Sequence, residues 1–159
     1  MKSLIVSVAI IFFTSFAFAE SLGSTKVPTI LADKMDGNLI GKYIEFYKDE
    51  KGDATLEKIM SGELKFKRVK SEVINFGSTN VVHWLRFKIK FEKDKKWILA
   101  LEIPWIGYID FYKVKNKAVE KITTGDRYKF SQREIKNRLF AFYINEGEET
   151  QYFMRIKTS

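Results

Sequence analysis

Short runs of alternating apolar and polar residues recur along most of the chain. The clearest run spans 81–91, where His83, Leu85, Phe87, Ile89 and Phe91 alternate with Val82, Trp84, Arg86, Lys88 and Lys90. A period of two is typical of a strand with one buried and one polar face. Residues 97–103 alternate in the same way after a polar turn at 92–96. The two runs are therefore predicted to pair as a hairpin.

Other segments have the same β character. Strands are predicted at 39–47, 108–114, 119–123, 138–144 and 151–157, with a short edge strand at 28–31. One short helix is expected at 54–60, with Asp53 as its N-cap and Gly62 as its stop. Several short strands at even spacing indicate a single all-β domain, either a sandwich or a barrel.

The first 20 residues follow a different pattern. Lys2 precedes an apolar run from Leu4 to Phe18, and small residues surround the end of that run at Ala17 and Ala19. This is the pattern of a secretory signal peptide at 1–19, and cleavage is predicted after Ala19. A retained anchor is the less favoured alternative, because the run is shorter than the roughly 20 residues that span a bilayer.

The expected product of cleavage is a periplasmic or secreted chain without a transmembrane segment. Residues 20–36 form a leader with the edge strand, and 37–159 form the domain. The 159-residue chain has no cysteine. Packing, rather than disulfide bonds, must therefore stabilise the fold.

The charge balance is basic. The whole chain has a net charge of +8, with 28 Lys and Arg against 20 Asp and Glu. Acidic residues interrupt almost every basic cluster, whereas a nucleic-acid site needs a continuous basic stripe. A nucleic-acid partner is therefore not expected.

Residue types that carry catalysis are sparse. His83 is the sole histidine and falls on the apolar face of its predicted strand, so a satisfied core histidine is favoured over a triad or a metal ligand. Glu146, Glu148 and Glu149 fall in a turn, where they solvate a hairpin. The glycines lack the spacing of a phosphate loop. We therefore expect a protein that is not an enzyme and has no metal or cofactor.

Binding is better supported than catalysis. Trp84 and Arg86 share the polar face of the clearest strand, and an exposed indole beside a guanidinium suits a sugar ring or an anionic group. Alternatively, Trp84 packs beneath a loop and Arg86 pairs with Glu102 or Asp110. Weaker ligand-binding candidates are Arg133 in a loop, Arg155 in an apolar strand, and Trp105 at a bend, where it rims a site or caps the core.

An ordered set of motifs resembles a known bacterial family. The set comprises Gly41–Asp49, Thr55–Met60, Phe66, Asn75–Gly77, Trp84–Phe87, Trp97–Leu101, Ile109–Tyr112, Gly125–Asp126, Arg133 and Tyr152–Ile156. Together these motifs resemble the type 2 extracellular domain of seven-transmembrane receptors with diverse intracellular signalling modules. The resemblance implies a jelly-roll β-sandwich of about eight antiparallel strands with one short helix, similar to carbohydrate-binding modules.

The resemblance also implies a function. It is that of a ligand-sensing input domain for which a carbohydrate is the implied ligand, here without the membrane and output modules. A small-molecule ligand and a membrane-protein signalling partner are the implied partners. The alternative hypothesis is a non-enzymatic subunit that docks on an envelope protein through an edge strand or a basic face.

Overall fold

A computed structural model of the chain describes residues 27–34, 37–77, 79–91, 97–103, 105–144 and 149–158. The predicted signal peptide and the predicted turns at 92–96 and 145–148 lie outside these residues. The chain divides into two compact units. The described part of the first is Thr55–Lys65, and the second consists of Val27–Ala54 and Phe66–Ser159. Among the described residues, no helix is long and apolar enough to cross a membrane.

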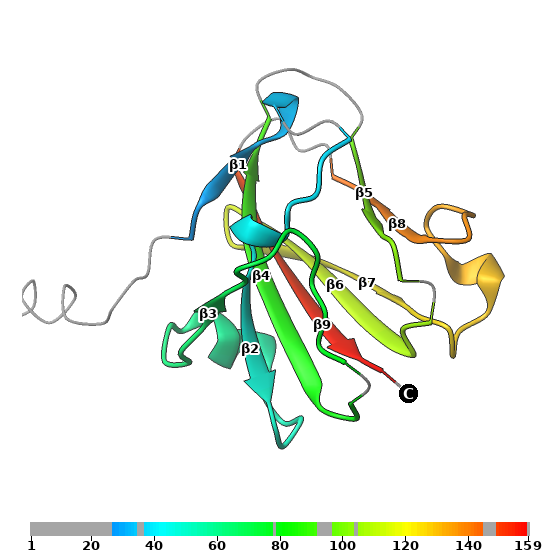
Figure 1. The fold of residues 1–159 in the computed structure, drawn as a ribbon, viewed down its shortest axis with the longest axis horizontal. Helices are drawn as coiled ribbons and strands as arrows, with labels where there is room; N and C mark the ends of the chain where they lie inside the picture. The colour runs from blue at the N-terminus through cyan, green and yellow to red at the C-terminus, as the bar shows by residue number, and fades with distance from the viewer. Residues whose placement is uncertain are drawn as a thin grey trace, which may run out of the picture. The chain divides into compact units, whose positions relative to one another are not determined.

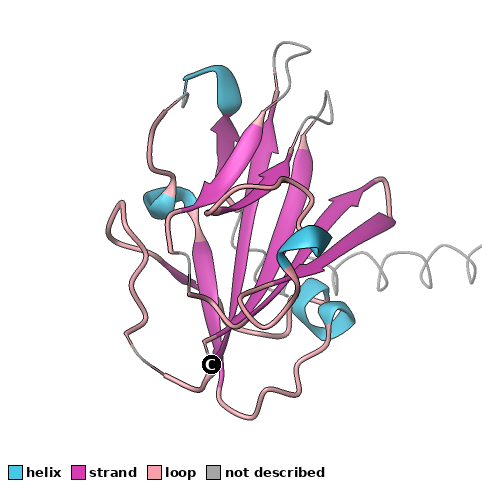
Figure 2. Cartoon of the chain, turned by 90° about the vertical axis from the view of Figure 1, so that its right-hand side faces the viewer, coloured by secondary structure: helices cyan, strands magenta, loops and turns pink. Residues whose placement is uncertain are grey.

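The second unit contains two sheets (Figure 1). The large sheet consists of β1 (Thr29–Leu31), β2 (Glu45–Asp49), β3 (Lys67–Arg68), β4 (Val82–Lys90), β6 (Tyr108–Lys115), β7 (Ala118–Thr124) and β9 (Thr150–Lys157). The small sheet consists of β5 (Ile98–Leu101) and β8 (Phe140–Tyr143). Apart from short helical turns at η1 (Ala32–Lys34), η2 (Gly41–Tyr43) and η3 (Phe130–Gln132), the regular structure of this unit is strand (Figure 2).

Strand β4 lies at the centre of the large sheet. The order across the sheet is β3-β2-β4-β9-β6-β7, and β1 also pairs with β4. β9 occupies one edge of β4, whereas β2 and β1 pair with successive parts of the strand, at Val82–Arg86 and Lys88–Lys90. The pairs are antiparallel, as predicted, except that β1 runs parallel to β4. The edge strand expected at 28–31 is β1, and its Ile30 is buried in the core.

The two sheets pack face to face through aromatic side chains. Phe111 of β6 contacts Phe142 of β8, with ring centroids 4.4 Å apart. Phe111 also stacks on Tyr152 of β9, which in turn stacks on Phe87 of β4. Stacked and tilted rings of this kind stabilise a core beyond the area that they bury. These contacts confirm the all-β sandwich predicted from the sequence, with sheets of unequal size.

The prediction of one polar face on β4 is wrong. Trp84 is 1% exposed, and Val82 and Arg86 on the same face are also buried. The opposite face is buried too, through Leu85, Phe87 and Ile89 in the core. A central strand loses solvent on both sides, so its polar residues must find partners within the protein.

The predicted hairpin of 81–91 with 97–103 is also wrong. β5 pairs with β8, with Ile98 opposite Tyr143 and Leu101 opposite Phe140. Both edges of β4 are already occupied by β9, β2 and β1, so no edge is left for β5. The predicted inward face is confirmed for Trp97, Leu99 and Leu101, which pack against the core, whereas Ile103 is exposed.

Two other predicted elements begin later than expected. The strand expected at 39–47 starts as the turn η2 and becomes β2 only at Glu45, because the backbone of Gly41 lies against that of Glu72. A Cβ atom on Gly41 would lie 2.1 Å from the Glu72 oxygen. In the first unit, helix α2 spans Leu56–Met60, and its N-cap is Thr55 rather than Asp53. The predicted glycine stop is present, since Gly62 has a φ of +83°.

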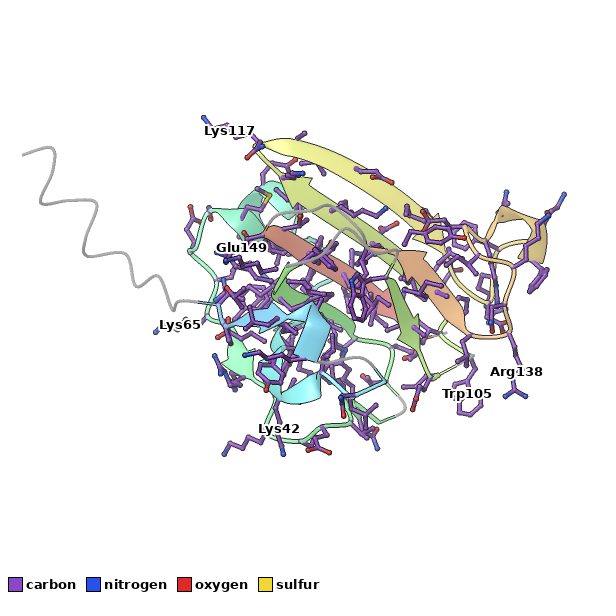
Figure 3. The ribbon with its side chains drawn as sticks, turned by 90° about the horizontal axis from the view of Figure 1, so that it is seen from above. Lys42, Lys65, Trp105, Lys117, Arg138 and Glu149 are labelled. Atoms are coloured by element: carbon purple, nitrogen blue, oxygen red, sulfur yellow. The ribbon has the colours of Figure 1, made fainter. Side chains whose placement is uncertain are left out.

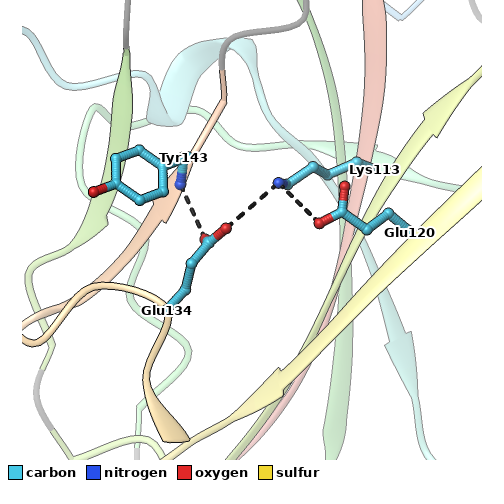
Figure 4. A network of polar contacts seen from close by, with 4 residues as sticks. All are labelled: Lys113, Glu120, Glu134 and Tyr143. Carbon is cyan, nitrogen blue, oxygen red and sulfur yellow. Dashed lines mark hydrogen bonds and ion pairs between the residues drawn. The ribbon is translucent and has the colours of Figure 1, made fainter.

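A buried lysine links the two sheets (Figure 4). The Nζ of Lys113 on β6 lies 3.2 Å from Glu120 on β7 and 3.7 Å from Glu134 in the loop before β8. The other carboxylate oxygen of Glu134 accepts a hydrogen bond from the backbone N–H of Tyr143 on β8, at 3.1 Å. Glu134 therefore joins the edge of the small sheet to a cation of the large one.

A close crossing of two glycines sets the shape of one end of the sandwich. Gly125 follows β7 with a φ of +142°, and a Cβ atom there would lie 2.1 Å from the Gly107 oxygen. The backbone N–H groups of Asp126 and Arg127 donate to the oxygens of Ile106 and Gly107, at 2.7 and 3.2 Å. Only a residue without a side chain permits this approach.

We expect Gly125→Ala to lower the free energy of unfolding by more than the strained φ alone would, which is about 1–3 kcal/mol. Overlap of the new methyl group with the Gly107 oxygen supplies the excess. Urea denaturation followed by tryptophan fluorescence measures the loss. Gly62→Ala is the control, because it also places a side chain at a positive φ but meets no atom within 4 Å. Equal losses in the two variants would show that the crossing imposes no steric constraint.

Candidate functional site

Trp84 is not available as an exposed binding surface. Its indole is 1% exposed and stacks on Tyr112 of β6, with ring centroids 5.8 Å apart. In the sheet register it lies between Tyr47 of β2 and Arg155 of β9. The structure therefore matches the alternative of a packed tryptophan, and the expectation of an exposed indole is wrong.

Arg86 is held by the buried carboxylate of Glu45. Its Nε lies 2.8 Å from Oε2 of Glu45, which is its register partner on β2. Arg68 of β3 approaches the same carboxylate at 3.8 Å. The guanidinium also lies over the ring of Phe66, 4.1 Å from its centroid. Arg86 thus pairs with a carboxylate of a neighbouring strand, as the alternative hypothesis predicts. The carboxylate is that of Glu45 rather than Glu102 or Asp110.

The other two arginine candidates have structural partners as well. Arg155 on β9 donates to the Gly52 oxygen at 3.3 Å. Arg133 donates to the backbone oxygens of Asn137 and Arg138, at 2.6 and 2.9 Å, and lies over the ring of Phe140. Arg133 therefore closes the loop before β8. The structure does not bring these two arginines together with Trp84 and Arg86 in an open site.

Trp105 is the predicted candidate that the structure exposes. Its side chain is 69% exposed and projects away from the sandwich (Figure 3). Three more exposed aromatic residues occur nearby in the chain or in the adjoining segment: Tyr108 at 40%, Tyr128 at 38% and Phe130 at 52%. We call these four residues the aromatic rim. The exposure of Trp105 contradicts the role of capping the core, and the role at the rim of a binding site stays a prediction.

The rim is built on the glycine crossing. Tyr108 and Tyr128 stand on its two sides, and their rings meet edge to face with centroids 6.0 Å apart. The hydrogen bonds between 106–107 and 126–127 hold the two segments together, and Tyr128 N–H donates to the Gly125 oxygen at 3.2 Å. Phe130 is held in turn by the guanidinium of Arg133, 5.1 Å from its ring centroid. These contacts restrict the rings of Tyr108, Tyr128 and Phe130.

Three of the four rim residues were missed from the sequence. Tyr128 and Phe130 lie between the predicted strands 119–123 and 138–144, and Tyr108 is predicted only as the first residue of a strand. A local signal was present in the run Arg127-Tyr128-Lys129-Phe130, where cations alternate with aromatic residues outside any apolar period. Aromatic residues that alternate with cations in a loop are expected to be exposed, because loops run over the protein surface.

A second, more polar surface feature lies near the start of β2. It is a hollow of about 510 Å³ lined by Lys34, Gly37, Asn38, Leu39, Lys42, Tyr43 and Glu72. Lys42 is neutralised by Glu72, with Nζ and Oε1 2.9 Å apart. Tyr43 is the aromatic residue of its lining. This hollow has the volume of a small-molecule site but less aromatic surface than the rim.

His83 is packed as a core residue. It is buried on β4, and its ring stacks on Phe76 with centroids 4.1 Å apart. Burial lowers the pKa of His83, and a backbone hydrogen bond with Val81 opposes that shift. The neutral ring is therefore favoured. Among the described residues, no group of three or more His, Cys, Asp or Glu could hold a metal ion.

Comparison with known proteins places the chain in a family. Residues 41–159 match the family described as 7TMR-DISM extracellular 2. The chain belongs to this family. The match begins at η2 and covers both sheets from β2 to β9, which includes the aromatic rim. Among curated proteins, none matches the chain.

Membership in the 7TMR-DISM extracellular 2 family identifies the chain as an extracellular sensor-domain relative. It confirms the family that the ordered motifs indicated. The motif Trp84–Phe87, which contributed to that resemblance, lies on the strand that is buried on both faces. The family motifs in this strand are therefore accounted for by packing and by the Glu45–Arg86 pair.

We expect Glu45→Ala to destabilise the protein by about 3–5 kcal/mol, because it leaves the buried guanidinium of Arg86 without its carboxylate. The double variant Glu45→Leu with Arg86→Met should lose less, since it removes both charges. Chemical denaturation of the single and double variants gives the comparison.

Lys48→Ala serves as a control for this experiment. It breaks an exposed pair with Glu50 at 2.8 Å, and such pairs contribute about 0–1 kcal/mol. If Arg86→Met left the stability unchanged, Arg86 would not be a structural residue, and its assignment as a ligand group would be open again.

Proposed function

We propose that this domain senses a carbohydrate by binding it on the aromatic rim. The observation that carries the proposal is Trp105, whose large ring is 69% exposed, together with the three further exposed rings of the rim. Exposed aromatic groups of this size that gather in one place commonly mark a binding surface. Sugar rings have apolar C–H faces that stack on indole, and tyrosine adds a hydroxyl group for hydrogen bonding.

The fixed geometry of the rim favours binding. Aromatic side chains have few rotatable bonds, and the Tyr108–Tyr128 contact restricts two of them further. Little conformational entropy is therefore lost when a ligand is bound. The crossing of Gly107 and Gly125 also limits this loss of entropy, because its hydrogen bonds hold the segments of Tyr108 and Tyr128 in one arrangement.

We propose binding without chemical change of the ligand. His83 is buried and stacked on Phe76, away from solvent. The carboxylates with the lowest exposure serve structural contacts, as Glu45 does with Arg86, and as Asp49 does by accepting from the N–H groups of Gly52 and Ala54. A general acid or base needs a proton-transfer group that a substrate can reach.

Export is part of this proposal. The family is extracellular, and the pattern at 1–19 is that of a cleaved signal peptide. We expect the exported protein to begin at Glu20, with the mass of residues 20–159. Intact-mass spectrometry of the protein from the periplasm or the medium gives the result. A mass that includes residues 1–19 would show a retained anchor instead.

We expect a carbohydrate to raise the melting temperature of the protein in a screen of neutral and acidic mono- and oligosaccharides. A ligand at 100 times its Kd adds about 2.7 kcal/mol to the free energy of unfolding. Trp105→Ala should weaken binding at least about tenfold, because it removes the stacking surface. Isothermal titration of both proteins measures the ratio.

Tyr43→Ala provides the matched control, because it removes a partly exposed ring from the polar hollow instead of the rim. Binding that survives Trp105→Ala but is lost in Tyr43→Ala would move the site to the hollow. Absence of any stabilisation across the saccharides would exclude carbohydrate sensing and favour a protein partner.

Docking on an envelope protein is the second candidate function. The observation in its favour is β7, which ends the strand order of the large sheet. Its outer edge has no neighbouring strand in the described part of the chain, and Val119 on it is 49% exposed. An edge strand of seven residues can accept an extended peptide through backbone hydrogen bonds.

A further inference from the structure

The segment that contributes Tyr128 and Phe130 to the rim is also basic. Exposed cations flank Tyr128 and continue toward β8: Arg127, Lys129, Lys136 and Arg138. In the described part of the chain, none of these four side chains forms an ion pair. Of the two acidic residues in the same segment, Glu134 is engaged by Lys113 and Tyr143, which leaves Asp126. The loop therefore presents uncompensated positive charge next to exposed rings.

A further cation reaches the rim from a different strand. Lys157 on β9 is the register partner of Tyr108 and is exposed. Arg138 and Trp105 project from the same side of this unit (Figure 3). Cations thus adjoin the rim both from its own loop, next to Tyr128, and from the C-terminal strand, opposite Tyr108.

We propose that the ligand of the rim is an anionic saccharide, such as a chain of uronic acid units. This proposal rests on the proposed function and adds the charge of the ligand to it. The sugar ring stacks on Trp105, and its carboxylate accepts hydrogen bonds from Arg127 and Lys129. Hydrogen bonds between ionised groups are about twice as strong as neutral ones, and arginine can bind a carboxylate through two of them.

The cations beside Tyr128 are placed by the backbone. Three backbone hydrogen bonds hold residues 125–128 at the crossing, including the one that Arg127 N–H donates to the Gly107 oxygen. The backbone therefore fixes the Cα positions of these residues, while their exposed side chains can contact a ligand. Attraction by several like charges also raises the rate of encounter with an anion, and salt weakens this effect.

Aromatic and basic residues together also suit an anionic membrane surface. Two features of the rim favour the saccharide. Tyr108 and Tyr128 carry hydroxyl groups that offer directional hydrogen bonds, and their rings are turned edge to face instead of forming a flat apolar surface. A polyhydroxylated ligand uses these groups, whereas acyl chains do not.

The test uses protein purified after expression of the full chain. Oligosaccharides of galacturonic, glucuronic and mannuronic acid are titrated beside their methyl esters, which keep the ring and remove the charge. We expect an acid to bind at least about tenfold more tightly than its ester at low salt, and 0.5 M NaCl to reduce this ratio. The double variant Arg127→Ala with Lys129→Ala should bring the two affinities together, while retaining the affinity for the ester.

The matched control is Lys67→Ala with Lys70→Ala. It removes the same charge from the part of the chain at β3, which is at the opposite edge of the large sheet from β7, and it should preserve the ratio. Equal affinity of the wild-type protein for acid and ester would overturn this inference and leave the proposed function intact. Binding of both that is insensitive to Trp105→Ala would overturn the rim as the site. Binding to phosphatidylglycerol vesicles without binding to any oligosaccharide would overturn both proposals.

Discussion

Burial of strand β4 on both faces is the constraint from which much of this structure follows. A central strand can carry an arginine only if a carboxylate meets it inside the protein. Glu45 does so from β2, which lies antiparallel on this edge of β4 with Glu45 opposite Arg86. β1 takes the rest of that edge and β9 takes the other. The small sheet must then form separately from β5 and β8, and it covers the large sheet through the contact between Phe111 and Phe142.

The arginines and lysines discussed above fall into two groups, according to whether they have partners within the protein. Arg86, Arg133 and Lys113 are held by Glu45, by backbone oxygens and by Glu120 with Glu134, respectively. These groups tie strands and loops together, and removing Arg86 from its contact would leave the buried carboxylate of Glu45 without its nearest cation. Among the described residues, the cations near the aromatic rim form no such ion pairs. A ligand can therefore engage them without competing against the fold.

Aromatic residues have different roles in the interior and at the rim. Inside the sandwich, Phe87, Phe111 and Tyr152 stack on one another and exclude water. At the rim, Trp105 and its neighbours retain much of their exposed surface, and the crossing of Gly107 and Gly125 holds the chain beneath them. A sensor domain needs both properties. The sandwich positions the rim, and the exposed rings are available to the ligand that we propose.

The sequence by itself determined the all-β class, the family, most strand positions and the inward face of 97–101, because alternation and ordered motifs are local properties of the chain. It also singled out Trp105 at a bend. Only the tertiary structure decided which strands pair, that Trp84 is buried, and that Arg86 meets Glu45 rather than Glu102 or Asp110. Alternation shows that two faces differ, but an arginine and a tryptophan look the same in sequence whether water or another part of the protein covers them. The rim is likewise tertiary, since Tyr108 and Tyr128 become neighbours only when Gly125 crosses Gly107.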